Sequence, residues 1–419
     1  MEKHHILNIN DIKDRKVLDQ NRRTFMVGSI RYMFQGEVNA SGFPKGVGTL
    51  YKEVSEHLKA HLAPGVDYAL AYHGMWTTRF VLNGKGWYKN EEFTVQGTFR
   101  TVTVDERRQF YFHNTATVTI NATGDTFEGK LTKGMQLDVG LYTYKNGTTY
   151  RGSFHTETRK THYGTYVSND PKDPSYTYTG NFVEDKKHGI GALVFRNGNV
   201  FNGSFEEDKP KKGLLLNYDA ESKVFRYEGP VDDKFRPHGT GKGSKKLSAS
   251  DAVFMQGEFK EGKFIRGKRI HKKNNVVVET HDGSWNGKKF EGTVKTTVNG
   301  QVTVRQGRFG TSGHILAGRY THADGIEYIG KFHDGKASGK GIQIHKNGDV
   351  YSGKWKQDKK DGDFVVWKKQ PRDEDGFDYK RSEVVFEKDT KKTTKSAVLK
   401  RKRDFDDFVR TQKRVCLVA

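Results

Sequence analysis

The only cysteine of the 419-residue chain, Cys416, lies in the closing sequence KRVCLVA. A cysteine followed by two aliphatic residues and a final Ala fits the C-a-a-X pattern, which directs prenylation of the thiol. One lipid chain anchors a protein only reversibly, so a second membrane signal is normally needed. Nearby basic residues would supply it by binding anionic phospholipid headgroups: Lys400, Arg401, Lys402, Arg403, Lys413 and Arg414. We therefore expect lipidation at Cys416; the alternative interpretation is a terminal thiol without a role.

Residue types that support catalysis are present but are not arranged as a known active site. The 16 histidines form no H-E-x-x-H motif, and a single cysteine excludes a cysteine-type zinc site. GKFIRGKR, residues 262–269, has the glycine spacing of a P-loop, but Arg269 stands where Ser or Thr must bind magnesium. We expect a protein that is not an enzyme and that needs no cofactor or metal.

The composition favours a thin β structure over a deep globular core. Glycine is abundant at 47 residues and proline scarce at 8, while hydrophobic residues make up only 33% of the chain. The aromatic residues, 27 Phe, 19 Tyr and 5 Trp, dominate what apolar material there is. One cysteine suits a reducing compartment, and no apolar run is long enough to span a membrane, so we expect a cytoplasmic protein. The net charge of +22 favours acidic or anionic partners.

An internal repeat runs through most of the chain. The segment YIGKFHDGKASGKGIQIHKNGDVYSGKW, residues 328–355, begins and ends with an aromatic-x-Gly-x-aromatic pattern, and six of the twelve intervals between its central glycines are 23 or 24 residues. Those glycines are Gly36, Gly74, Gly97, Gly129, Gly152, Gly180, Gly203, Gly229, Gly257, Gly283, Gly307, Gly330 and Gly353. Such self-similarity at a fixed period is the signature of a repeat architecture.

Each repeat is predicted to form two short antiparallel strands. Alternation places both aromatic residues and the glycine between them on one face of the first strand. About ten residues later comes a Gly-x-Gly-x-aliphatic segment such as HGIGAL, residues 188–193. Asn-Gly pairs follow, as at Asn146–Gly147 and Asn347–Gly348, and they favour type I′ turns with positive φ at both positions.

These motifs resemble the MORN (membrane occupation and recognition nexus) repeat. The resemblance covers about residues 30–367 and implies a mostly β fold: an elongated single-layer antiparallel sheet of about 13 tandem hairpins with short helical or disordered termini. The structural residues of the repeat would be Gly74, Trp76, Tyr150, Gly152, Tyr178, Gly180, Phe182, Gly203, Tyr328, Gly330, Tyr351, Gly353 and Trp355.

Four segments depart from the repeat. Residues 1–29 are expected to form a partly helical N-terminal cap, and 51–65 a helical insertion in which Val54, Leu58 and His61 have helical spacing. Residues 368–395 read as a charged linker with one strand expected at Glu383 to Phe386, and 396–419 as a basic amphipathic tail. In that tail, helical spacing of apolar and polar residues predicts a helix: Phe405, Phe408, Val409 and Gln412.

The resemblance and the tail together suggest a scaffold or tether that binds proteins at the cytosolic face of a membrane. One alternative is a viral or cytoskeletal assembly protein without a lipid anchor. A second is a nuclear basic protein, because residues 400–403 read KRKR. No nucleic-acid-binding motif is present, which disfavours nucleic acid as a partner. Exposed aromatic residues on a one-layer sheet would favour a homo-oligomer.

Overall fold

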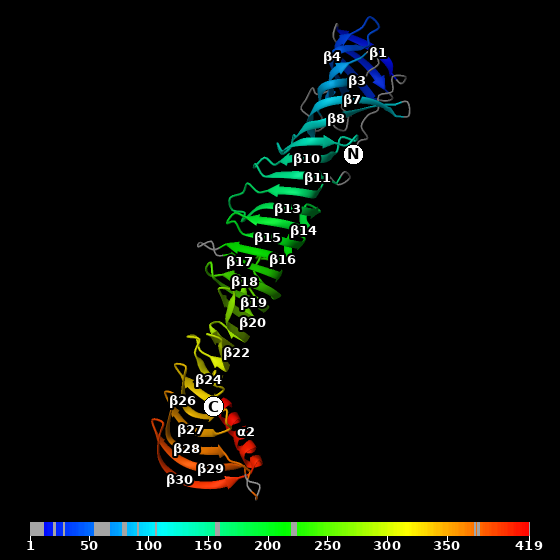
Figure 1. Cartoon of the computed structure of the whole chain (residues 1–419). Helices are drawn as coiled ribbons and strands as arrows, with labels where there is room; N and C mark the ends of the chain where they lie inside the picture. Colours follow the sequence, from blue (N-terminus) through cyan, green and yellow to red (C-terminus); the bar gives the residue numbers. More distant parts are fainter. Residues whose placement is uncertain are drawn as a thin grey trace. The chain divides into compact units, whose positions relative to one another are not determined.

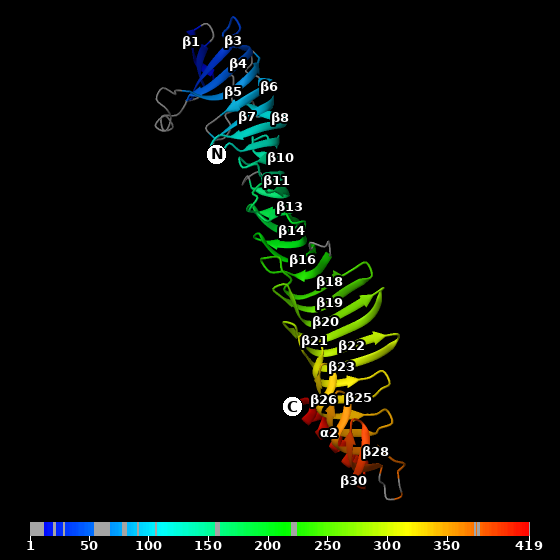
Figure 2. The same ribbon diagram turned by 90° about the vertical axis from the view of Figure 1, so that its left-hand side faces the viewer.

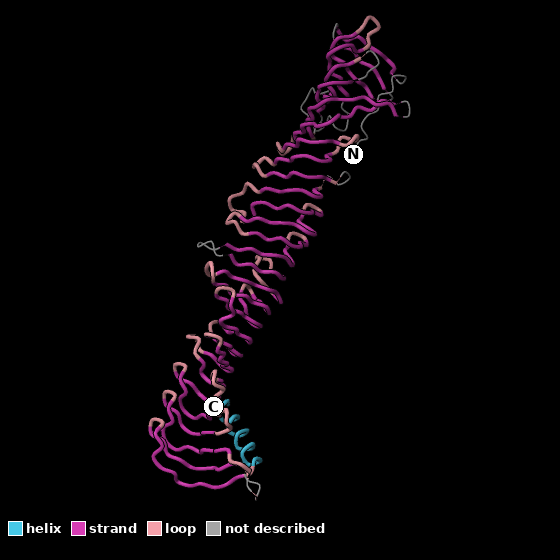
Figure 3. The backbone as a smooth tube through the Cα atoms, viewed as in Figure 1, coloured by secondary structure: helices cyan, strands magenta, loops and turns pink. Residues whose placement is uncertain are grey.

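The computed structural model describes residues 12–19, 22–27, 30–53, 68–77, 82–89, 92–104, 107–155, 160–218, 224–372, 374 and 378–418. These residues fall into two compact units, unit 1 (Met1–Pro210) and unit 2 (Lys211–Ala419). Strands make up almost all the regular structure in both units, and one helix lies near the C-terminus (Figure 1, Figure 3).

Unit 1 is built from strands that follow one another along the chain. They are β1 (Ile12–Asp19), β2 (Arg22–Val27), β3 (Ile30–Val38), β4 (Pro44–Glu53), β5 (Tyr68–Trp76), β6 (Leu82–Lys89), β7 (Phe93–Val104), β8 (Arg107–Ile120), β9 (Thr126–Leu131), β10 (Leu137–Thr143), β11 (Thr149–Phe154), β12 (Thr161–Val167), β13 (Ser175–Val183), β14 (Lys186–Phe195) and β15 (Val200–Glu206). Each pairs antiparallel with the next.

Unit 2 continues the same scheme and adds the helix. Its strands are β16 (Lys209–Tyr218), β17 (Val224–Pro230), β18 (Gly239–Lys246), β19 (Asp251–Lys260), β20 (Lys263–Lys273), β21 (Val276–Asn286), β22 (Lys289–Val298), β23 (Gln301–Phe309), β24 (Ile315–Thr321), β25 (Glu327–His333), β26 (Lys336–Ile344), β27 (Val350–Lys356), β28 (Lys359–Lys369), β29 (Tyr379–Glu387) and β30 (Thr390–Lys400), followed by α2 (Lys402–Val418). Consecutive strands again pair antiparallel. The predicted mostly β fold of tandem hairpins is confirmed.

The strand register places glycine opposite glycine. Gly152 faces Gly164, Gly164 faces Gly180, and Gly180 faces Gly191. The row continues to Gly203 on β15. Glycines in a strand interior mark a close approach of another group, and here the approaching groups are aromatic rings. We call the side of the sheet that carries these rings the aromatic face, and the other side the opposite face.

The hairpin turns differ from the sequence prediction. At Asn146–Gly147 and Asn347–Gly348 only the glycine has positive φ. Gly147 N–H donates to the Tyr144 carbonyl at 2.8 Å, and the Asn146 side chain accepts the Thr148 N–H. This is the arrangement of a type I turn followed by a glycine bulge. Positive φ at both central residues occurs instead in the other hairpin of the repeat, as at Glu207 (47°) and Asp208 (69°).

Two segments outside the predicted array are corrected by the structure. The described part of residues 1–29 contains strands β1 and β2 rather than a helix, because Phe25 is buried and stacks on Tyr32 of β3 at 5.7 Å. In the predicted linker 368–395, the strand expected at 383–386 is part of the longer strand β29, and β30 begins within the same range, since Val384 and Phe386 are buried in the core of unit 2. Val54, Leu58 and His61, expected to be helical, lie outside the described residues.

Candidate functional site

The aromatic face is held together by tyrosine rings that lie over the glycine row. Tyr150 and Tyr178 have no exposed surface, and their hydroxyls donate to the carbonyls of Ser153 (2.8 Å) and Asn181 (2.9 Å). The same bond to the residue three positions later recurs at Tyr328. Burial raises the pKa of Tyr178 to about 12. This phenol therefore stays a neutral donor at physiological pH, which suits a structural role and not acid–base catalysis.

The other predicted repeat residues lie on neighbouring strands of the same kind. Gly74 and Trp76 are on β5, Gly152 on β11, Gly180 and Phe182 on β13, Gly203 on β15, Gly330 on β25, and Tyr351, Gly353 and Trp355 on β27. Both tryptophans are buried, and their indole N–H groups donate to glycine carbonyls of Gly48 (2.9 Å) and Gly341 (3.2 Å). The aromatic side chains among these repeat residues therefore stabilise the sheet itself.

Aspartates in the hairpin turns, here called the turn aspartates, connect successive repeats and were not predicted from the sequence. Asp208 accepts the backbone N–H of Lys187 at 2.9 Å, Asp358 that of Ala337 at 2.6 Å, and Asp389 that of Lys360 at 2.8 Å. Each bond reaches back into the preceding repeat, at least 21 residues earlier. A recognisable signal does exist, because Asp stands three residues after the second aromatic at Phe205, Trp355 and Phe386.

The C-terminal helix lies on the opposite face of unit 2. Phe405 stacks on Tyr379 with ring centroids 3.9 Å apart, and Phe408 lies 5.3 Å from Trp367. Gln412 accepts a hydrogen bond from Ser352 at 3.1 Å. Both views show α2 crossing the strands at the C-terminal end (Figure 1, Figure 2). The predicted helix with Phe405, Phe408, Val409 and Gln412 on one side is confirmed, and that side is occupied by the sheet.

The basic residues of the tail do not converge on one site. Lys400 ends β30, Arg401 follows it, and Lys402 and Arg403 begin α2. Lys402 forms an ion pair with Asp406 at 2.6 Å. Lys413 and Arg414 lie about three helical turns after Lys402 and Arg403, which is about 16 Å along the helix axis at 1.5 Å per residue. The backbone of Cys416 lies in the last turn of α2, and its side chain is outside the described residues.

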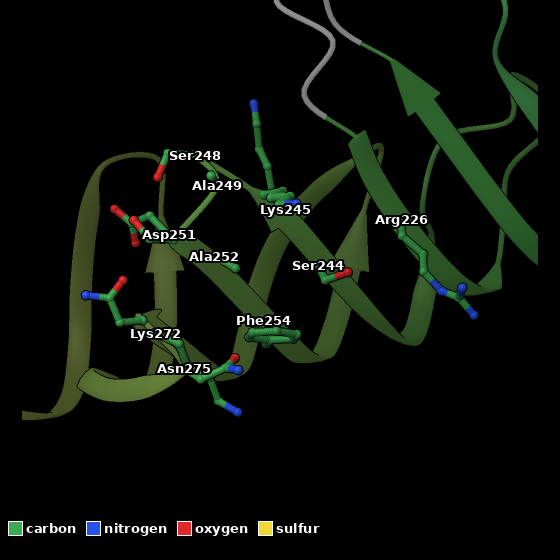
Figure 4. Close-up of a pocket in the computed structure, with 13 residues that line it drawn as sticks. Arg226, Ser244, Lys245, Ser248, Ala249, Asp251, Ala252, Phe254, Lys272 and Asn275 are labelled. Carbon is green, nitrogen blue, oxygen red and sulfur yellow. The ribbon is translucent and has the colours of Figure 1, made fainter.

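A hollow of about 510 Å³ lies on the opposite face of β17–β20 (Figure 4). Phe254 lines it together with three basic residues, Arg226, Lys246 and Lys272, and the Lys272 ammonium is 5.2 Å from the centroid of the Phe254 ring. The rest of the lining comes from the loop 248–250, the turn at 274–275, and Ser244, Lys245, Asp251 and Ala252. This basic, hydroxyl-rich lining suits the binding of an anion.

Unit 1 exposes a row of apolar side chains on the opposite face. Val139 is 44% exposed, Tyr163 53% and Ile190 64%. Each precedes a glycine of the glycine row, so its side chain points away from the aromatic face. Within the described residues, no group of three or more His, Cys, Asp or Glu side chains could hold a metal ion, and no helix is long and apolar enough to cross a membrane.

The MORN repeat family model matches residues 178–200, 328–350 and 351–362. The chain carries MORN repeats. The first match spans β13 and β14 from Tyr178, and the second spans β25 and β26 from Tyr328, so one MORN repeat corresponds to one aromatic strand and the glycine strand that pairs with it. The predicted resemblance is confirmed. No curated protein matches the chain.

Proposed function

We propose that this MORN repeat protein is a non-enzymatic scaffold that binds protein partners on the opposite face of its sheet. The observation that carries the proposal is the exposed apolar row of Val139, Tyr163 and Ile190 in unit 1. The three side chains lie on alternate strands, with Ser153 and Asn181 on the strands between them. Large apolar side chains that recur on one exposed face mark candidate interaction sites. MORN repeats and a repeat sheet are themselves typical of protein-interaction modules.

The helix of unit 2 supports this choice of face. In unit 2 the opposite face carries Ile329, Ile342 and Val350, and the apolar side of α2 packs against them. This intramolecular contact demonstrates that the opposite face of the repeat sheet can receive an amphipathic segment across several strands. In unit 1 the described residues place no such segment on Val139, Tyr163 and Ile190, which are free to bind one from another protein.

Replacing Tyr163 and Ile190 by Asp should remove partner binding without unfolding unit 1. Both side chains are more than half exposed, so the substitutions leave no core cavity. A buried interfacial charge without a partner is costly, and we expect at least a tenfold loss of affinity, roughly 1.4 kcal/mol or more. Partners co-purified with the wild-type protein from its native cells would be identified by mass spectrometry and compared with those of the variant. An exposed polar substitution nearby, Asn202→Asp, is the control. An identical partner set for all three proteins would refute the proposed surface.

We further propose that the scaffold is held at the cytosolic face of a membrane through lipidated Cys416. Two features support this: the C-a-a-X pattern, and the exposed arginines of α2, Arg403, Arg410 and Arg414. The apolar side of α2 packs on the sheet, so the membrane would meet the basic side of the helix and the attached lipid. Each basic residue near an anionic leaflet contributes about 1 kcal/mol.

Cys416→Ser should move the protein from the membrane fraction to the soluble fraction of its native cells. The intact mass of the wild-type protein should show a prenyl group on Cys416 that the variant lacks. An N-terminal tag keeps the C-terminus free in both proteins, and Ser396→Ala serves as a control variant with an unaltered thiol. Identical fractionation of wild type and Cys416→Ser would favour an assembly protein without a lipid anchor.

A further inference from the structure

In the first half of unit 2, several charged residues of the opposite face stand across from a residue of opposite charge on the neighbouring strand. On the opposite face, residues of opposite charge stand across from each other at Glu228 and Lys242, Glu258 and Arg266, Lys268 and Asp282, and Glu291 and Arg308. Opposite charges at facing positions stabilise a sheet, and like charges destabilise it. The register of these strands therefore neutralises the charge at these four positions, although Lys260 faces Lys263 next to the turn between β19 and β20.

This pairing of opposite charges is absent at three lysines on β25, β26 and β27. Lys340 faces Lys354 directly. Lys331 lies on the next strand, beside Gly330, whose partner Gly341 is beside Lys340. All three lysines are exposed, and no described carboxylate forms an ion pair with any of them. On β28, the strand next to β27, Asp363 forms an ion pair with Lys395 at 2.6 Å. We call these residues, Lys331, Lys340 and Lys354, the lysine ladder.

The lysine ladder lies beside the residues of the sheet that α2 contacts. On β26, Lys340 is two residues from Ile342, and on β25, Lys331 is two residues from Ile329; both isoleucines pack in the cluster that includes Phe405 and Phe408. Residues two apart on a strand share a face. The ladder therefore runs across the strands on the same face as α2 and in the direction in which α2 crosses them.

We propose that the lysine ladder binds the acidic side of an α-helix in a protein partner, lying alongside α2. Adjacent strands are about 4.8 Å apart, so the three lysines, separated by two strand spacings, span about 10 Å. Carboxylates at positions i, i+4 and i+7 of a helix span about 10.5 Å at 1.5 Å per residue. The spacing of the lysines thus matches one acidic stripe, and the packed α2 shows that this face holds a helix in that orientation. The inference rests on the proposed scaffold function in one respect, namely that the partner is a protein.

The test uses the full-length protein and a labelled peptide of about 20 residues, long enough to be helical. The peptide consists of Ala with Glu at i, i+4 and i+7 repeats along one side, and a staple on the other side keeps it helical. Its binding is followed by fluorescence anisotropy at low and physiological salt. A second stapled peptide of the same composition, with its Glu residues distributed around the helix, is the matched ligand control.

Lys340→Glu/Lys354→Glu should weaken binding of the striped peptide at least tenfold. Lys242→Glu/Lys268→Glu, which makes the same change in net charge at neutralised positions, should weaken it less than threefold. Lys340→Glu alone should raise the melting temperature, because it creates an opposite-charge pair with Lys354, and yet reduce binding. Lys340→Gln/Lys354→Gln serves where the double reversal does not fold.

Three outcomes would overturn the inference. Equal weakening by the two double reversals would mean that binding follows net charge alone. Equal affinity for the striped and distributed peptides would remove the helical stripe. Binding of phosphatidylserine vesicles through the lysine ladder without binding of the striped peptide would assign the surface to lipid. None of these results depends on Tyr163 or Ile190, so the test fails or succeeds separately from the proposed partner surface of unit 1.

Discussion

Gly191→Ala should destabilise unit 1 by about 3 kcal/mol, because the added methyl group would overlap the ring of Tyr178. The ring cannot yield easily, since it has no exposed surface and its hydroxyl is bonded to the Asn181 carbonyl. In an open strand the same substitution would be favourable by about 0.5–1 kcal/mol, because Gly loses more conformational freedom on folding than Ala. The sign of the effect therefore reports the contact between ring and backbone.

A double-mutant cycle isolates this contact. Tyr178→Ala alone should cost about 3–5 kcal/mol through the lost ring. In that background the overlap no longer exists, so adding Gly191→Ala should cost little or nothing, and the two effects should fall short of additivity by about 2–3 kcal/mol. Denaturant unfolding gives the free energies, and hydrogen exchange of the β13 and β14 amides assigns them to unit 1.

Gly134→Ala is the matched control for the cycle. A methyl group there would meet only the Thr132 hydroxyl oxygen at 3.7 Å, an ordinary van der Waals distance. We expect a change within about 0.5 kcal/mol, as is usual for surface substitutions. If Gly191→Ala cost the same free energy with and without the Tyr178 ring, the packing of rings over the glycine row would not be the source of stability.

Phe405→Ala/Phe408→Ala should release α2 from unit 2. The two rings make the stacked contact with Tyr379 and the contact with Trp367, and both are partly buried, so we expect a loss of about 2 kcal/mol for each. Most of the stability of a helix in a protein comes from the packing of its amphipathic face, and these two rings are part of that face in α2. The released segment should therefore unfold, and its amides should exchange as fast as those of a free peptide.

Hydrogen exchange followed by mass spectrometry measures this release directly. Arg403→Ala/Arg410→Ala, two exposed changes on the same helix, should leave the exchange of α2 close to that of the wild type. Release also uncovers Ile329, Ile342 and Trp367, so the Phe variant should bind a dye that fluoresces on apolar surfaces. Continued protection of the α2 amides in the Phe variant would show that other contacts hold the helix.

The sequence predicted the repeat and the tail helix because both have strong local patterns. Glycine between aromatic residues marks the strand centres, and the spacing of Phe405, Phe408, Val409 and Gln412 marks one side of a helix. The partner of that side was not predictable, since it is formed by residues such as Ile329 and Trp367 from distant repeats. The turn chemistry was assigned to the wrong hairpin, because Glu207–Asp208 lacks the Asn or Gly typical of turns with positive φ.

Two errors had the same physical origin. Residues 12–27 and 368–395 are rich in charge, which favours a cap and a linker over paired strands, and only residues 383–386 have the pattern of a strand. In a one-layer sheet only alternate side chains on each strand need to be apolar, so Val384 and Phe386 suffice to bury β29. The candidate surfaces depended still more on three-dimensional register: Lys340 and Lys354 are 14 residues apart in sequence and become neighbours only when β26 pairs with β27.

The turn aspartates give the repeat sheet a defined response to force. A pull along the direction in which strands follow one another would load one strand pair at a time, because each strand is hydrogen-bonded only to its neighbours. Separating a strand pair such as β13 and β14 from the sheet would also break the hydrogen bond that the Lys187 amide on β14 donates to Asp208, a residue of the next repeat. The sheet within each unit should therefore lengthen in steps of one repeat, and the hydrogen bond of each turn aspartate should resist the next step.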